Sequence, residues 1–117
     1  GIPDKKAVYA VTRSYYGGLV RSGVRIFEYT PGFCHAKQCV CDGMIASIGT
    51  SNLDYRSLYH HFENNVLLYD CPVIGDIEKD FLDTFSICRE VTQAYQHPRS
   101  VVMRIWQCIL RLFAPMM

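Results

Sequence analysis

The sequence predicts an α/β fold, a mixed β-sheet flanked by helices, from three observations. Half of its 117 residues are apolar and 20% are charged, which is typical of one folded domain with a core. Apolar residues recur at helical spacing near both ends of the chain and again before the last segment. Between these stretches lie short β-like runs, two of which are joined by an Asp-Gly pair.

The first helix is expected over residues 5–21, with Gly23 just beyond its end. Strands are expected at 24–29, closed by Pro31 and Gly32, and at 62–69. The runs 34–41 and 44–48 are predicted to form a hairpin that turns at Asp42 and Gly43, and residues 50–59 a polar, turn-rich loop. The helix expected at 5–21 has its apolar residues at spacings of three and four: Ala7, Val8, Val11, Tyr15 and Leu19.

A second helix is predicted from Val73 to about Tyr95, where His97-Pro98 ends it. A third, amphipathic helix is expected over residues 100–113. We therefore predict a catalytic half-domain over residues 1–97 and a C-terminal segment over 98–117. The second helix rests on the spacing of Ile74, Ile77, Phe81, Phe85, Cys88 and Val91. The third has Val102, Ile105, Trp106, Ile109 and Phe113 on one face and Arg104, Gln107 and Arg111 on the other.

Charge and cysteine usage narrow the function classes. A net charge of +1 does not call for a nucleic-acid partner. The six cysteines lack the ligand spacing of a structural zinc site, so we expect reduced, buried thiols and no metal. Neither a transmembrane run nor a signal peptide is predicted. A start at Gly1 rather than Met favours a fragment of a longer protein.

His35 and Lys37 are the pair that carries chemistry. Two apart in a predicted strand, they are expected to leave the same face. Such a pair suits an anionic, oxygen-rich ligand: the ammonium neutralises phosphate charge, and the imidazole attacks phosphorus or transfers a proton. The hairpin is expected to bring the turn after Gly49 beside His35, where the Thr50 hydroxyl and the Asn52 amide can reach phosphoryl oxygens.

This pattern, HxK, x4, D, x6, GTxN, resembles the HKD motif of the phospholipase D superfamily. Stretches on both sides of it look like the surroundings of the second HKD motif in bacterial cardiolipin synthases, so the chain resembles their C-terminal half. Those stretches are Arg13–Tyr16, Gly23–Tyr29, Pro31-Gly32, Gly49–Asp54, Arg56-Ser57 and Phe62–Asn65.

The resemblance implies a phospholipase D-like half-domain whose activity passes a phosphatidyl group from one phosphatidylglycerol to another through a phosphohistidine. His35, Lys37, Thr50 and Asn52 match the catalytic and phosphate-binding positions, and His35 matches the general acid. Asp42 matches an aspartate that supports the fold, and its place beside Gly43 also marks it as a turn residue. Glu63 matches a glutamate that orients the histidine. No cofactor or metal is implied.

Only one HKD motif is present, whereas the family builds its site from two. The second is expected from the rest of a longer chain or from a second copy. The resemblance implies an anionic phospholipid as partner and a place at the bacterial cell membrane, on its cytoplasmic side or peripheral to it. The alternatives are a single-motif phosphodiesterase, nuclease or phospholipase working as a homodimer, and a non-catalytic lipid-binding fragment. His60 and His61 are expected at the surface. Arg13 is expected to face water, with contact to lipid phosphate as the alternative.

The amphipathic C-terminal helix supplies a second hypothesis. Trp106 and Phe113 lie on its apolar face, and Arg104 and Arg111 on its polar face, as in helices that lie in a membrane interface. Packing on the domain or on a missing half is the alternative. The lipid substrate implied by the resemblance favours the membrane.

Overall fold

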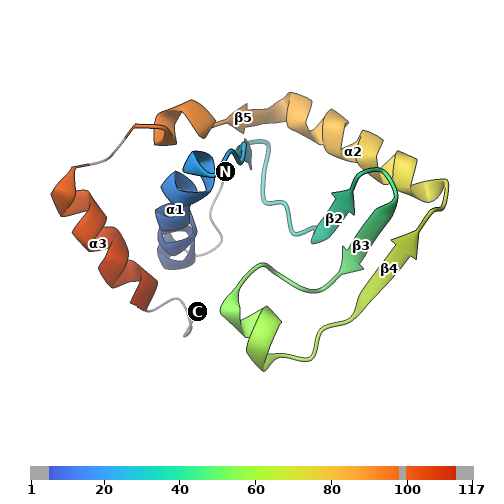
Figure 1. Cartoon of the computed structure of the whole chain (residues 1–117), viewed down its shortest axis with the longest axis horizontal. Coiled ribbons are helices and arrows are strands. Elements are labelled where there is room, and N and C mark those ends of the chain that lie inside the picture. Colours follow the sequence, from blue (N-terminus) through green and yellow to red (C-terminus); the bar gives the residue numbers. More distant parts are fainter. Residues whose placement is uncertain (1–5, 98–99, 113–117) are drawn as a thin grey trace. The chain divides into compact units, whose positions relative to one another are not determined.

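The computed structural model describes residues 6–97 and 100–112 (Figure 1). Its chain forms two compact units, one comprising residues 34–87 and the other the segments before and after them. The expected α/β class is confirmed. The strand pairs of the described part are all antiparallel and fall in two sheets.

The unit of residues 34–87 is a three-stranded sheet covered on one face by a helix. Its strands are β2 (Gln38–Cys41), β3 (Ile45–Gly49) and β4 (Asn65–Tyr69), in that spatial order. Helix α2 (Val73–Ile87) follows β4 and packs against the sheet (Figure 1). The buried apolar residues are Ala46, Ile74 and Ile77, with Val40, Leu68, Cys71 and Phe81 packed around them.

The predicted hairpin is confirmed between β2 and β3. Asp42 (φ 51°) and Gly43 (φ 64°) both have positive φ, and Met44 N donates to Cys41 O across 3.0 Å. Positive φ at both central residues belongs to the turn whose twist matches paired strands. This turn fixes the register in which Cys41 faces Ile45.

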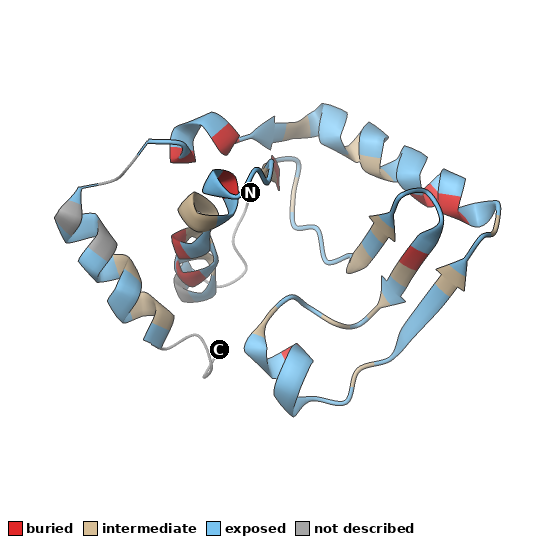
Figure 2. Ribbon diagram, viewed as in Figure 1, coloured by how far each residue is buried: buried red, intermediate tan, exposed pale blue. Residues whose placement is uncertain are grey.

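The second unit holds α1 (Lys6–Arg21), strands β1 (Phe27–Tyr29) and β5 (Cys88–Glu90), the 3-10 turn η2 (Thr92–Tyr95) and helix α3 (Val101–Leu112). Strands β1 and β5 form an antiparallel pair, and α1 packs against both η2 and α3. A small core of Val20, Val91 and Tyr95 joins these elements, with Tyr16 and Ile26 packed around it (Figure 2).

A buried carboxylate also ties this second unit together. The Glu28 side chain is 2% exposed and lies between Arg13 Nε at 3.3 Å and Arg89 Nη2 at 2.8 Å. The Arg13 guanidinium stacks over the rings of Tyr9 and Tyr95. The expectation that Arg13 faces water is therefore wrong, because its charge is paired inside the unit.

Burial works to raise the pKa of Glu28, yet that pKa is lowered overall. Hydrogen bonds from Arg89 and Tyr9 and the charge of Arg13 outweigh the burial. The carboxylate therefore stays ionised at neutral pH.

The helix predicted from Val73 to about Tyr95 is wrong beyond Ile87. Residues 88–90 form β5 instead, because β1 offers them a partner: Cys88 faces Tyr29 and Arg89 faces Glu28. Helical spacing of Cys88 and Val91 gave no sign of this long-range pairing. The helices expected at 5–21 and 100–113 are present as α1 and α3, although Phe113 lies outside the described residues.

The structure corrects two further expectations. The predicted strands 24–29, 34–41 and 62–69 are shorter, and their first residues are irregular. The cysteines are free as expected but not buried: Cys34, Cys39, Cys41 and Cys108 are exposed, and Cys71 and Cys88 are half-buried.

Within the described residues no helix is long and apolar enough to cross a membrane. The domain boundary at residues 97/98 stays a prediction.

Candidate phosphodiester site

His35 and Lys37 lie in an irregular segment just before β2, not in a strand as predicted. Their side chains nevertheless meet. Lys37 Nζ is 2.8 Å from His35 Nε2 and 2.8 Å from His35 O. The ammonium group of a lysine has only protons to donate, so His35 Nε2 is the acceptor in this contact. The Nε2 lone pair is therefore held by Lys37, and the contact has to open before Nε2 can attack phosphorus or exchange a proton.

The turn after β3 is brought to this pair by one backbone contact. Gly49 N donates to Lys37 O across 3.1 Å, so the residues that follow Gly49 start beside Lys37. Gly49 also faces Asn65 in the pairing of β3 with β4. The HxK and GTxN parts of the motif, separate in sequence, therefore share one end of the sheet.

No side chain fits at Gly49. A Cβ added there would lie 2.7 Å from Asn65 Cα and closer still to Asn65 Oδ1 and Asn64 O. The first and last of these are backbone atoms that cannot swing away as a side-chain tip can. Glycine is thus required for β3 to approach β4 where the loop begins.

Gly49→Ala is therefore expected to lower the free energy of unfolding by about 1–3 kcal/mol, because the strands must separate to admit a methyl group. Denaturant unfolding measures this. Gly75→Ala is the matched control in the same unit: nothing lies within 4 Å of a Cβ added in that first turn of α2. The control is expected to be neutral or more stable by up to about 1 kcal/mol. An equal effect in both variants would contradict the steric explanation.

The Thr50 hydroxyl is held in place from two sides. Its Oγ1 accepts from Asn64 N at 3.0 Å and donates to Glu63 Oε2 at 2.5 Å. Thr50 N also donates to Asn64 O at 3.1 Å. The single hydroxyl proton is therefore given to Glu63, and a phosphoryl oxygen has to displace Glu63 to receive it. The structure thus makes Glu63 the partner of Thr50.

Asn52 is exposed, and its amide is steadied by Ser57. Asn52 Nδ2 donates to Ser57 Oγ at 3.4 Å, and Ser57 N donates to Asp54 Oδ1 at 2.8 Å. Ser57 is buried in the π-helical turn η1 (Arg56–His60), and it also hydrogen-bonds Glu63. The loop after Gly49 is thus a network centred on Glu63. Sequence reasoning missed Ser57, although its place in the family-like Arg56-Ser57 stretch was a signal.

The pKa of Glu63 is lowered from its ordinary 4.5 by hydrogen bonds, first from Thr50 and then from Ser57. A lowered pKa means that this carboxylate stabilises the fold fully above pH 4.5, and that the contribution is lost as the pH falls through the lowered value. Glu63→Gln keeps an acceptor for Thr50 but cannot titrate. The stability of the wild type is therefore expected to fall more steeply than that of Glu63→Gln below pH 4.5. Denaturant unfolding between neutral and acidic pH measures the two slopes; parallel slopes would contradict it.

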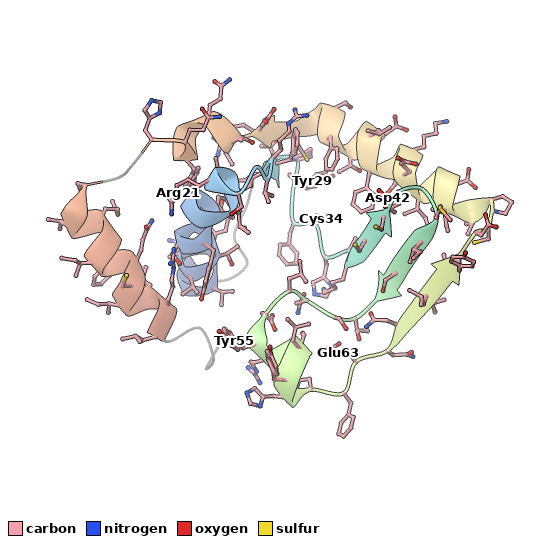
Figure 3. All side chains as sticks on the ribbon, in the orientation of Figure 1. Arg21, Tyr29, Cys34, Asp42, Tyr55 and Glu63 are labelled. Carbon is pink, nitrogen blue, oxygen red and sulfur yellow. The ribbon has the colours of Figure 1, made fainter. Side chains whose placement is uncertain are left out.

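Asp42 is not brought to His35. It lies at the β2–β3 turn, and Figure 3 shows it at the other end of the sheet from Glu63. Strand β2 separates it from Lys37. Cys41 Sγ donates to its carboxylate at 3.5 Å. Its position is that of a turn residue. His60 and His61 are exposed at the end of η1, as expected.

Comparison with known proteins identifies the chain. Residues 2–84 match the family described as "Cardiolipin synthase, PLD-like domain". The chain belongs to this cardiolipin synthase PLD-like family. The match covers the HKD motif, the loop network around Glu63 and most of α2.

Among the described residues, no group of three or more His, Cys, Asp or Glu side chains is placed to hold a metal ion.

Relatives of this PLD-like chain are much longer proteins. It is 41% identical over its whole length to an uncharacterised protein of Streptococcus mutans, and 38% identical, again over its whole length, to a cardiolipin synthase of Clostridium perfringens. It is 40% identical over 98% of its length to a cardiolipin synthase of Geobacillus kaustophilus. The matching region covers 25%, 25% and 23% of these proteins and forms their C-terminal part. No solved structure matches the chain.

Proposed function

We propose that this chain supplies one of the two HKD motifs of a phosphatidyltransferase, which makes cardiolipin and glycerol from two molecules of phosphatidylglycerol. The observation that carries the proposal is the meeting of His35, Lys37 and the Thr50 turn at one end of the sheet. Phosphodiester exchange needs an imidazole that acts as nucleophile or acid, a cation, and side chains that donate hydrogen bonds to the phosphate. The names of the longer relatives support the choice of lipid.

The reaction needs two histidines. One Nε2 attacks phosphorus, forming a phosphohistidine, while the second histidine protonates the departing glycerol oxygen. The same second group then removes the proton from the incoming glycerol hydroxyl, and the phosphatidyl group leaves the first histidine. Lys37 supplies positive charge to the phosphoryl oxygens throughout. The chain holds one such motif, so the remaining histidine is proposed to come from the rest of a longer chain.

Either role of His35 uses its Nε2 atom, which lies 2.8 Å from Lys37 Nζ and has to leave that contact before it reacts. The general-acid role implied by the motif's likeness to the second of two copies is retained as part of the proposal. Phosphatidylglycerol radiolabelled at phosphorus and rapid quenching in a neutral denaturant distinguish the roles, because a phosphohistidine is hydrolysed in acid: label on His35 itself would show that it is the nucleophile.

Localisation follows from the substrate. Phosphatidylglycerol lies in the membrane, and the described part of the chain holds no helix able to span it. Peripheral association with the cytoplasmic side of the bacterial cell membrane is therefore part of the proposal.

The test uses a hybrid enzyme in which this chain replaces the matching 115-residue segment of the Geobacillus kaustophilus relative. The hybrid and the chain alone are incubated with phosphatidylglycerol vesicles, and the products are followed by mass spectrometry. We expect the hybrid to produce cardiolipin and glycerol, and the isolated chain to produce neither. Phosphatidic acid would indicate hydrolysis instead, and cardiolipin from the chain alone would indicate a homodimer. A folded hybrid without any product would overturn the proposal.

A further inference from the structure

Helix α3 is held on α1 by its polar side. Among the α3 residues whose burial the structure describes, Gln107, Leu110 and Arg111 are half-buried. The Arg111 guanidinium donates to Ser14 O and, across 3.4 Å, to Ser14 Oγ, and it stacks over the Tyr15 ring 4.7 Å from its centroid. Arg111, predicted on the polar face of this helix, therefore anchors α3 to α1.

The apolar side of α3 is left exposed by this arrangement. Trp106 is 57% exposed, and the residues at the two ends of the stripe, Val102 and Leu112, are 77% and 76% exposed. Spacings of three and four along a helix place such residues on one face. We call this the α3 apolar face: Val102, Ile105, Trp106, Ile109 and Leu112.

The C-terminal part of the sequence carries charge of one sign only. All eleven carboxylate residues of the chain precede residue 91. From residue 91 onward the sequence contains three arginines, Arg99, Arg104 and Arg111, and no Asp or Glu. An exposed apolar face within a purely basic segment is complementary to a surface that offers both negative charge and an apolar interior.

We propose that the α3 apolar face docks on the surface of an anionic phospholipid membrane, with Trp106 at the boundary between headgroups and acyl chains. The lipid class rests on the proposed function. A second copy of this chain is the less suitable occupant, because two segments that each carry three arginines and no carboxylate would repel each other. A membrane rich in phosphatidylglycerol supplies the missing negative charge.

Trp106 makes the proposal measurable, because it is the only tryptophan of the chain. The full chain is titrated with vesicles of phosphatidylglycerol or of phosphatidylcholine. The expected result is a blue shift of the Trp106 emission, quenching by brominated acyl chains, and binding at least about tenfold tighter to phosphatidylglycerol, since two arginines that reach an anionic surface contribute roughly fivefold each. Binding of equal strength to both lipids, or no shift with either, would overturn the proposal.

The variant Ile105→Glu/Ile109→Glu places two charges on the α3 apolar face and is expected to weaken vesicle binding at least about tenfold. Leu82→Glu is the control, because Leu82 on α2 is 62% exposed and lies in the other unit. Circular dichroism establishes that both variants fold. Unchanged binding of the double variant, or equal loss in the control, would overturn the proposal. So would a concentration-dependent Trp106 shift without lipid, which would indicate a second copy.

The experiments distinguish a failure of the docking inference from a failure of the proposed function. A hybrid that makes cardiolipin from detergent-dispersed lipid, while the chain ignores vesicles, would overturn the docking inference alone. Vesicle binding without any product from the hybrid would overturn the proposed function alone.

Discussion

Replacing His35 by alanine is expected to lower the rate of cardiolipin formation by the hybrid enzyme about 10³-fold or more. The variant removes the Nε2 atom that lies 2.8 Å from Lys37 Nζ, and with it either the attacking nitrogen or the proton carrier of the reaction. Lys37 and the loop network around Glu63 remain, so lipid still binds and a residual rate is expected. Product formation over time, measured at saturating phosphatidylglycerol, gives the ratio.

His97→Ala is the matched control for that experiment. His97 is an exposed histidine of the other unit and belongs to no part of the motif. Its rate is expected to equal that of the unchanged hybrid within about twofold. Because His35 is exposed, its variant is also expected to unfold at the same denaturant concentration as the wild type. A His35→Ala hybrid with more than a tenth of the original rate would contradict the catalytic role.

Glu28→Ala is expected to lower the free energy of unfolding by about 3 kcal/mol, the largest effect on stability that the structure predicts. Glu28 carries the charge that Arg13 and Arg89 face, and its side chain is 2% exposed. Without it, the Arg13 guanidinium stays between the Tyr9 and Tyr95 rings with no counter-charge. Denaturant unfolding followed by circular dichroism measures the change.

Glu90→Ala is the control, because Glu90 also pairs with an arginine but at the surface. Arg25 Nη2 lies 2.9 Å from Glu90 Oε2, and the two side chains are 67% and 38% exposed. Exposed pairs of this kind contribute about 0–1 kcal/mol, so the control is expected to stay within that range. Equal losses of unfolding free energy in the two variants would show that the burial of Glu28 adds nothing to stability.

Local sequence features correctly predicted the elements whose structure depends on residues close together in the chain. The spacing of apolar residues predicted α1, α3 and the first part of α2, and Asp42-Gly43 predicted the hairpin. The same local rule extended the second helix too far. Residues Cys88–Glu90 form a strand because they pair with β1. That partner lies about sixty residues earlier in the chain, so a rule that uses only neighbouring residues does not detect it.

The candidate site shows the same division. Residue types and spacing were enough to select His35, Lys37, Thr50 and Asn52, whose proposed roles in catalysis and phosphate binding remain predictions. Their contacts were not foreseen. Thr50 donates to Glu63, thirteen residues away, and Ser57 steadies Asn52. A motif records which groups the chemistry needs, whereas hydrogen bonds depend on how the loop closes.

The sequence by itself determined the fold class, the hairpin, the family resemblance and the expected chemistry, because each follows from residue type and short spacing. Only the tertiary structure decided that Glu28 is a buried hub, that Arg111 anchors α3, and that the α3 apolar face is the one left open. The physical reason is that burial and charge pairing join residues as far apart as Ser14 and Arg111, which are 97 positions apart. No local pattern specifies such a contact.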